Sequence, residues 1–116
     1  MLSFSSQQRY FLYSPATDMR KGVAGLSGLV RQHVAHPLMS GDVFIFINRR
    51  RDRIKLLMWD ANGFAMYYKQ LEKGTFRWST PDSSSSVELH WSDLVMLLEG
   101  IEIKSIKRRK RYQKTG

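Results

Sequence analysis

The fold is decided by the stretch VFIFINRRRDRIKLLMW, residues 43–59. Its first five residues are all apolar, which is typical of a central strand that is covered on both faces of a sheet. Asn48 to Asp52 is short and polar, as expected of a connection, and residues 53–59 predict the next strand. The stretch therefore predicts a β-hairpin whose tip is strongly basic.

Turn sequences extend this hairpin into a sheet. Asp60 to Gly63 and Glu72 to Gly74 are rich in turn-forming residues and bound further runs of strand-forming residues. An aromatic run near the start of the chain is closed by Ser14-Pro15 and predicts another short strand. We expect about four or five strands, and the candidate segments are residues 9–13, 43–47, 53–59, 64–71, 75–78 and 87–90. Residues 81–86 are expected to form a flexible loop.

Two stretches predict helices. Over residues 18–34, apolar side chains recur at steps of three and four along one face, at Met19, Val23, Leu26 and Val30. Thr17 is a suitable N-cap for this helix, and Gly22 on its apolar face would let the helix lie close to the sheet. A second helix is expected at about 93–99, capped by Ser92 and followed by Gly100, with a core face of Leu94, Leu97 and Leu98.

These elements predict an α+β fold, in which an antiparallel β-meander of about four or five strands packs with two helices. A chain of 116 residues has room for one such core, which we place at residues 9–103. Residues 1–8 are expected to form a flexible N-terminus and residues 104–116 a basic C-terminal tail.

Composition excludes several classes of protein. The chain has no cysteine, which excludes a disulfide scaffold, thiolate zinc and a cysteine nucleophile. Its longest apolar runs are far shorter than the ~18 residues that span a bilayer, and the first residues do not resemble a secretion signal. We therefore expect a cytoplasmic protein, nucleoid-associated if it binds DNA, with no membrane partner.

The distribution of charge points to a polyanionic partner. The net charge is +9, yet residues 104–116 hold seven basic residues and no acid, which leaves the other 103 residues with +2. Such a tail suits nucleic acid, although it could also serve solubility alone. The candidate contacts in the tail are Lys107, Arg108, Arg109, Lys110 and Arg111.

The hairpin tip is the main candidate site in the folded body. It carries five cations and one acid within seven residues, and the cations are Arg49, Arg50, Arg51, Arg53 and Lys55. The planar guanidinium suits bidentate contact with phosphate or with a guanine edge. The alternative is a solvated turn in which Asp52 pairs with one neighbour.

Arg20 and Lys21 form a secondary candidate site. In the predicted helix they lie in the first turn, where free backbone N–H groups and the Thr17 hydroxyl could help them hold a phosphate. Asp18 would repel that phosphate, so a structural cap with an Asp18–Arg20 pair is the alternative.

The sequence gives little support for catalysis or metal binding. Asp82, Glu102 and Lys104 fit a loose nuclease-like pattern, but a predicted helix separates them and Asp82 lies in a serine-rich loop. His33 and His36 have no evident third ligand, and we expect them to be surface histidines. We expect no catalytic residue, no metal and no cofactor.

Four ordered blocks carry a family resemblance. They are Thr17 to Gly22 with Gly25-Leu26, Phe44 to Asp60 with Gly63, Tyr68 to Trp78, and Leu97 to Ile101. In order and spacing they resemble the small accessory protein, the second open reading frame product, of bacterial insertion-sequence family sixty-six. The resemblance implies a bacterial mobile-element protein that assists transposition beside a separate transposase, and it implies no mechanism.

Residues and resemblance together predict a non-enzymatic accessory protein of transposition that binds DNA, at element ends or non-specifically. Two alternatives remain open. The protein could be an adaptor that docks on the transposase through a sheet edge or an aromatic face, or it could be an RNA-binding regulator.

Overall fold

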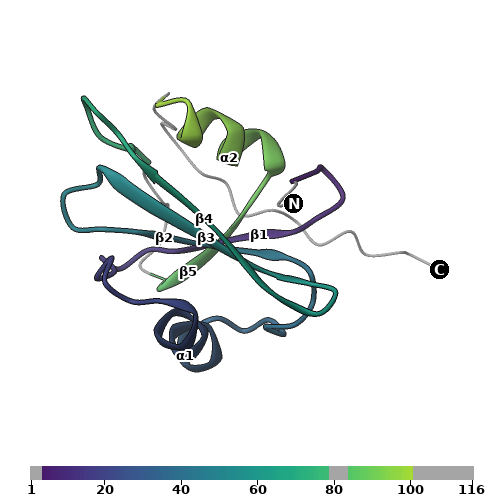
Figure 1. Cartoon of the computed structure of the whole chain (residues 1–116). Helices are drawn as coiled ribbons and strands as arrows, with labels where there is room; N and C mark the ends of the chain where they lie inside the picture. Colours follow the sequence, from purple (N-terminus) through teal and green to yellow (C-terminus); the bar gives the residue numbers. More distant parts are fainter. Residues whose placement is uncertain (1–3, 79–83, 101–116) are drawn as a thin grey trace.

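The computed structural model describes residues 4–78 and 84–100. Within them, a mixed five-stranded sheet lies between two helices, in three layers (Figure 1). The elements, in chain order, are β1 (Tyr10–Tyr13), α1 (Val23–His33), β2 (Val43–Ile47), β3 (Arg53–Asp60), β4 (Gly63–Gln70), β5 (Ser86–Leu89) and α2 (Trp91–Leu98). The predicted α+β class is confirmed.

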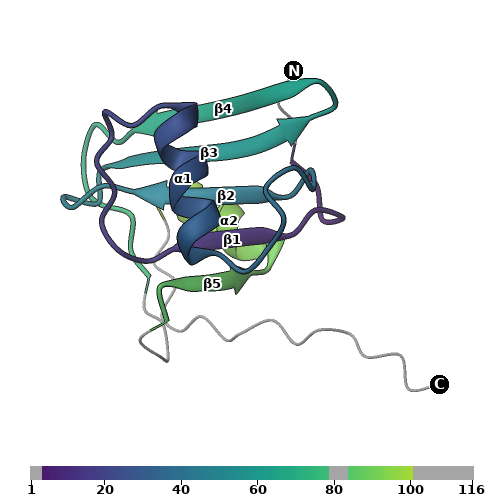
Figure 2. The same ribbon diagram turned by 90° about the horizontal axis from the view of Figure 1, so that it is seen from below.

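The strand order is β4-β3-β2-β1-β5, so β2 is the central strand, as the apolar run predicted. β2, β3 and β4 form the expected antiparallel meander. β1, however, pairs parallel to β2, and α1 connects these two strands across one face of the sheet (Figure 2). β5 pairs antiparallel with the other edge of β1. The sheet is therefore mixed, with one parallel pair in an otherwise antiparallel arrangement.

Each face of the sheet packs its own core, because successive residues of a strand point to opposite faces. The core toward α2 contains Tyr10, Leu12, Val43, Ile45, Ile47, Ile54, Leu56, Met58, Phe76, Val87, Leu89, Leu94 and Leu97. The core toward α1 contains Phe11, Tyr13, Leu26, Val30, Val34, Leu38, Phe44, Phe46 and Leu57. All five side chains of β2 are buried since both of its faces are covered.

α1 begins at Val23, five residues later than predicted. Thr17 does not cap it, because Thr17 lies well before the first helical residue, where its amide donates to the Ile47 carbonyl at the end of β2, at 2.9 Å. Gly22 takes the N-cap position and provides no side-chain cap. A Cβ on Gly22 would meet nothing within 4 Å, so its predicted close approach to the sheet is wrong.

Two further details differ from the prediction. Residues 75–78 form no strand, although Phe76 is fully buried in the core toward α2. The cap of α2 is His90 rather than Ser92, and the Asp93 side chain accepts a hydrogen bond from the His90 amide at 3.1 Å. Gly100 follows the helix with a φ of 79°, as expected of a residue after a helix end.

Residues 81–83 of the predicted loop and the whole basic tail lie outside the described residues, and Ser86, the last residue of that loop, begins β5 instead. Among the helices that the structure describes, none is long and apolar enough to cross a membrane.

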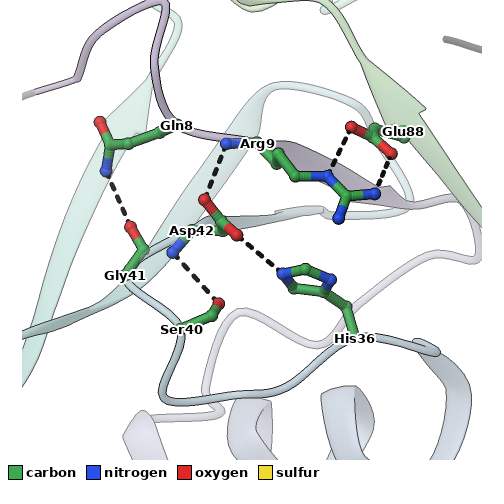
Figure 3. A network of polar contacts seen from close by, with 7 residues as sticks. All are labelled: Gln8, Arg9, His36, Ser40, Gly41, Asp42 and Glu88. Atoms are coloured by element: carbon green, nitrogen blue, oxygen red, sulfur yellow. Dashed lines mark hydrogen bonds and ion pairs between the residues drawn. The ribbon is translucent and has the colours of Figure 1, made fainter. Parts of the chain in front are cut away.

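A closed polar network ties together the starts of β1 and β2 (Figure 3). The Asp42 carboxylate accepts from the Arg9 amide at 2.8 Å and lies 2.7 Å from Nε2 of His36. The Arg9 guanidinium makes two hydrogen bonds to Glu88 on β5, at 2.6 and 2.9 Å. His36 also lies against Phe11, with ring centroids 4.3 Å apart, and its side chain is only 9% exposed. The expectation that His36 is a surface histidine is therefore wrong, whereas His33 is exposed.

Candidate nucleic-acid interface

The tip of the β2–β3 hairpin is held in one conformation by Asn48. Its Oδ1 accepts from the amides of Asp52 and Arg53, both at 3.0 Å, and its Nδ2 donates to Asp52 Oδ1 at 2.7 Å. The Arg51 amide closes the turn by donating to the Asn48 carbonyl at 3.0 Å. These bonds use the polar groups of Asn48 internally and leave the arginine side chains on the outside of the turn.

The segment that follows β4 supports the tip from the other side. Leu71 donates its amide to the Asp52 carbonyl at 2.7 Å, and Phe76 donates to the Arg51 carbonyl at 2.6 Å. Arg51 adopts a left-handed φ of 59°, and its guanidinium lies over the Trp78 ring, 4.0 Å from the centroid. Arg51 is therefore directed to Trp78, apart from the other arginines of the tip.

The segment before α1 meets the hairpin on the face of the sheet that carries α1. Besides the contact of Thr17 with β2, the Lys55 ammonium donates to the carbonyls of Met19 and Lys21, at 2.7 and 2.9 Å. Met19 and Lys21 are thus tied to β3, and the helix begins only after them, at Val23. The contact brings the two predicted basic sites side by side.

Between them lies a pocket of about 460 Å³. Its lining consists of four arginines, two aspartates and four further residues, namely Arg20, Arg49, Arg50, Arg53, Asp18, Asp52, Thr17, Met19, Asn48 and Tyr68. Residues 17–20, the hairpin tip and β4 thus contribute to one concave surface.

The charges in this pocket differ in how they are satisfied. Arg20 forms a bidentate pair with Asp18, with a shortest distance of 2.7 Å. Hydrogen bonds from Arg20 lower the pKa of Asp18 to about 2. By contrast, the guanidiniums of Arg49, Arg50 and Arg53 have no hydrogen-bond or ion-pair partner within the part of the chain that the structure describes, and all three residues are exposed. They are cations available to a ligand.

Comparison with known proteins places the chain in a family. The model of the IS66 Orf2 like protein matches residues 8–108. The chain belongs to this family. The resemblance drawn from the four sequence blocks is confirmed, and membership supports an accessory role in the transposition of insertion sequences.

Two relatives of the chain come from Sinorhizobium fredii strain NGR234. The uncharacterized protein y4jC is 28% identical over 109 residues, covering 94% of this chain and 92% of the relative. The uncharacterized protein y4hO is 26% identical over 116 residues, covering both chains completely. No solved structure matches.

In this member of the IS66 Orf2 like family, the predicted site residues fall into three groups. The first group lines the pocket and consists of Arg20, Arg49, Arg50 and Arg53. Asp18 and Asp52, which the sequence analysis considered as their pairing partners, line the pocket as well. Lys55 anchors the segment before α1, Arg51 lies over Trp78, and Lys21 is exposed without lining the pocket. The tail residues Lys107, Arg108, Arg109, Lys110 and Arg111 lie outside the described residues.

Sequence reasoning missed Tyr68. It lies on β4 directly opposite Lys55, on the face of the sheet that carries α1, and is 48% exposed. The signal was the alternation along β4, which places Tyr67 against the core and Tyr68 outward. Only the fold shows that Tyr68 lines the same pocket as the arginines at the β2–β3 hairpin tip.

No three histidine, aspartate or glutamate side chains in the described ranges 4–78 and 84–100 come together as a metal site. Asp82, Glu102 and Lys104, the nuclease-like candidates, lie outside these ranges.

Proposed function

We propose that the protein is a non-enzymatic accessory protein of transposition that binds DNA through the β2–β3 hairpin tip. The observation that carries the proposal is the grouping of Arg49, Arg50 and Arg53 around one pocket, with no partner for their guanidiniums among the described residues.

The physical argument concerns the free energy of like charges. Cations held a few residues apart on one turn repel one another, and the repulsion is relieved when an anion binds between them. Asp52 offsets only part of this charge, because one carboxylate faces the guanidiniums of Arg49, Arg50 and Arg53. Guanidiniums bind phosphate oxygens by paired, charge-assisted hydrogen bonds, and a DNA backbone supplies phosphates at regular spacing.

The remaining cations have secondary roles in this proposal. Arg20 lines the same pocket and pairs with Asp18 through Nε and one terminal nitrogen, so its other terminal nitrogen can still contact a phosphate, while Lys21 adds charge nearby. Lys55 positions the segment that carries Arg20 and does not itself reach the DNA. The basic tail would neutralise further phosphates without regard to sequence; about six such contacts give a slope of log Kobs against log salt near −5.

The test is a fluorescence-anisotropy titration with a terminal inverted-repeat duplex of the element, at several salt concentrations. The variant R49A/R50A/R53A removes the three free cations. The matched control R31A/K73A/R77A removes three exposed cations that do not line the pocket. We expect the first variant to bind about tenfold more weakly or worse, with a salt slope smaller by about 3, and the control to change little.

Equal losses in the two triple variants would contradict the hairpin assignment, provided that circular dichroism shows both to be folded. A full-length variant with Lys107, Arg108, Arg109, Lys110 and Arg111 all changed to glutamine tests the tail. Preference for the repeat over a scrambled duplex, retained in that variant, supports recognition by the folded body. Loss of all binding in that variant would leave only a cationic clamp, and stronger competition by single-stranded RNA would favour an RNA-binding regulator.

A further inference from the structure

We infer that the pocket beside the hairpin tip takes one unpaired nucleotide, whose base stacks on Tyr68 and whose phosphate is held by the arginines at the rim. This inference rests on the proposed DNA binding and specifies the form of DNA that the pocket recognises. It distinguishes a DNA end or junction with an unpaired base from a continuous duplex.

The shape of the site favours an unpaired nucleotide. A duplex presents a convex backbone, and its bases are covered by their neighbours in the stack, so only a nucleotide out of the stack can enter a concave pocket. The pocket is open to solvent and its volume of about 460 Å³ gives room for one base. Arginines on a flat or convex tip would suffice for phosphate contact, whereas a concave site offers space for a base as well.

The wall of the pocket offers an aromatic ring to the base. Tyr68 is nearly half exposed, and the Lys55 ammonium lies 5.6 Å from its ring centroid. Two backbone carbonyls hold the Lys55 ammonium in place beside the ring. The Tyr68 ring is therefore positioned next to the arginines before a ligand binds. Stacking on such a ring is tolerant of sequence, because every base has a π-face.

The two aspartates argue against a site for a simple anion. Asp18 is satisfied by Arg20, but Asp52 uses only Oδ1, toward Asn48, and its Oδ2 has no hydrogen-bond partner among the residues that the structure describes. A carboxylate oxygen repels phosphate and accepts hydrogen bonds from the amino groups of bases. A nucleotide combines both properties, since it carries a negative phosphate for the arginines and N–H donors for Asp52.

The experiment compares three DNA probes with the full chain in anisotropy titrations. One probe is a blunt duplex, the second is the same duplex with a three-nucleotide 3′ overhang, and the third carries an overhang of the same length without bases. We expect the overhang probe to bind roughly 5- to 100-fold more tightly than the blunt duplex, since stacking of one base on an aromatic side chain contributes an affinity gain of about this size. The abasic overhang keeps its phosphates and loses its bases, so it should bind clearly more weakly than the overhang with bases, and the difference between these two probes measures the stacking.

The variant Y68A should abolish this preference, and Y68F should keep it, because phenylalanine retains the ring. M66A is the matched control: Met66 lies on the same face of β4, is 38% exposed and does not line the pocket, so its removal should leave the preference unchanged. In the unaltered chain, irradiation of an overhang that contains 5-iodouracil should crosslink the base to Tyr68, which mass spectrometry can locate.

The outcomes separate this inference from the proposed function. If the overhang and blunt probes bind equally while R49A/R50A/R53A weakens both, DNA binding by the hairpin stands and the unpaired nucleotide is wrong. If that triple variant binds the blunt duplex as well as the unaltered chain does, the proposed function itself fails. Crosslinks found only outside the pocket would also overturn the inference, independently of whether Y68A folds.

Discussion

The two ends of β2 carry the same kinds of charged side chain in opposite states. Before the strand, the Asp42 carboxylate, the Arg9 backbone and the His36 ring are in contact, and the Arg9 guanidinium is paired with Glu88 (Figure 3). After the strand, three arginines surround a pocket without partners among the described residues. We call these the closed end and the open end of β2.

The difference separates structural from functional charge. At the closed end, Arg9 contacts Asp42 and Glu88, which are 33 and 79 positions away in the sequence, and the pairing with Glu88 raises the pKa of Arg9. Charged side chains that are paired in this way stabilise the fold, and few of their hydrogen-bonding groups remain available to a ligand. At the open end the guanidiniums contribute nothing comparable to the fold, so their removal should cost binding and not stability.

The largest effect on stability is expected from opening the closed end. D42A removes the acceptor of the Arg9 amide and the partner of His36, and should lower the free energy of unfolding by about 2–3 kcal/mol in urea titrations. D60A also removes one carboxylate, at the exposed β3–β4 turn, and should change the free energy by less than about 0.5 kcal/mol. Similar values for the two variants would remove the distinction between the ends.

A smaller effect of opposite sign is expected at the open end. Thr17 is only 4% exposed, and its hydroxyl has no hydrogen-bond partner within the residues described. T17V should therefore raise the free energy of unfolding by about 1 kcal/mol, because it removes an unsatisfied polar group with little change of shape. T17S keeps the hydroxyl and should give no such gain; a loss of stability in T17V would show that the hydroxyl is satisfied.

Arg51 tests the comparison within the hairpin tip itself. It is the arginine of the tip that lies over an aromatic ring, so R51A should cost about 0.5–1 kcal/mol in thermal unfolding. Its loss should weaken DNA binding less than R49A or R50A does, since Arg51 does not line the pocket. The reverse ranking in anisotropy titrations would place the DNA on the Trp78 side of the tip.

The smallest effect concerns the exposed pair at the open end. Arg20 lowers the pKa of Asp18 to about 2 from its usual 3.8, so the pair is intact above about pH 4 and is lost as the pH falls through about 2. In an NMR titration of the Asp18 carboxyl, R20Q should return the pKa toward 3.8, whereas K21Q should change it much less. If DNA draws Arg20 away, the pKa of Asp18 should also rise in the complex.

The meander was predictable from short stretches of sequence, because each of its strands and turns is indicated by residues that are neighbours in the chain. The apolar run of β2 and the turn residues around Asn62 and Gly74 define strands β2 to β4 within one or two residues. The parallel pairing of β1 was missed: the uninterrupted apolar run of β2 is typical of strands in parallel sheets, but it does not say which strand lies beside it. The strand predicted at 75–78 is wrong: Phe76 is buried in the core toward α2, but its amide donates to the Arg51 carbonyl in the hairpin turn and not to a neighbouring strand.

The candidate site was predictable in its charge and not in its geometry. Clustered arginines are visible in the sequence, but the hydrogen bond from Lys55 to the Lys21 carbonyl, 34 positions away, is not, and it ties the segment before α1 to β3. The contact of Arg51 with Trp78 and the position of Tyr68 opposite Lys55 also depend on how separate elements pack together. Composition could therefore give the class of ligand, whereas the fold was needed to separate free cations from structural ones.

The position of β1 in the sheet has a consequence for the order of folding. One neighbour of β1 follows directly after α1, but the other, β5, lies far along the chain, and Arg9 and Glu88, which join them, are 79 positions apart. Contacts of such large separation form late, after the local meander. Until β5 docks, β1 is an open edge that can pair with another chain. We therefore expect β5 to complete the sheet late in folding and to cover the edge of β1 when it docks.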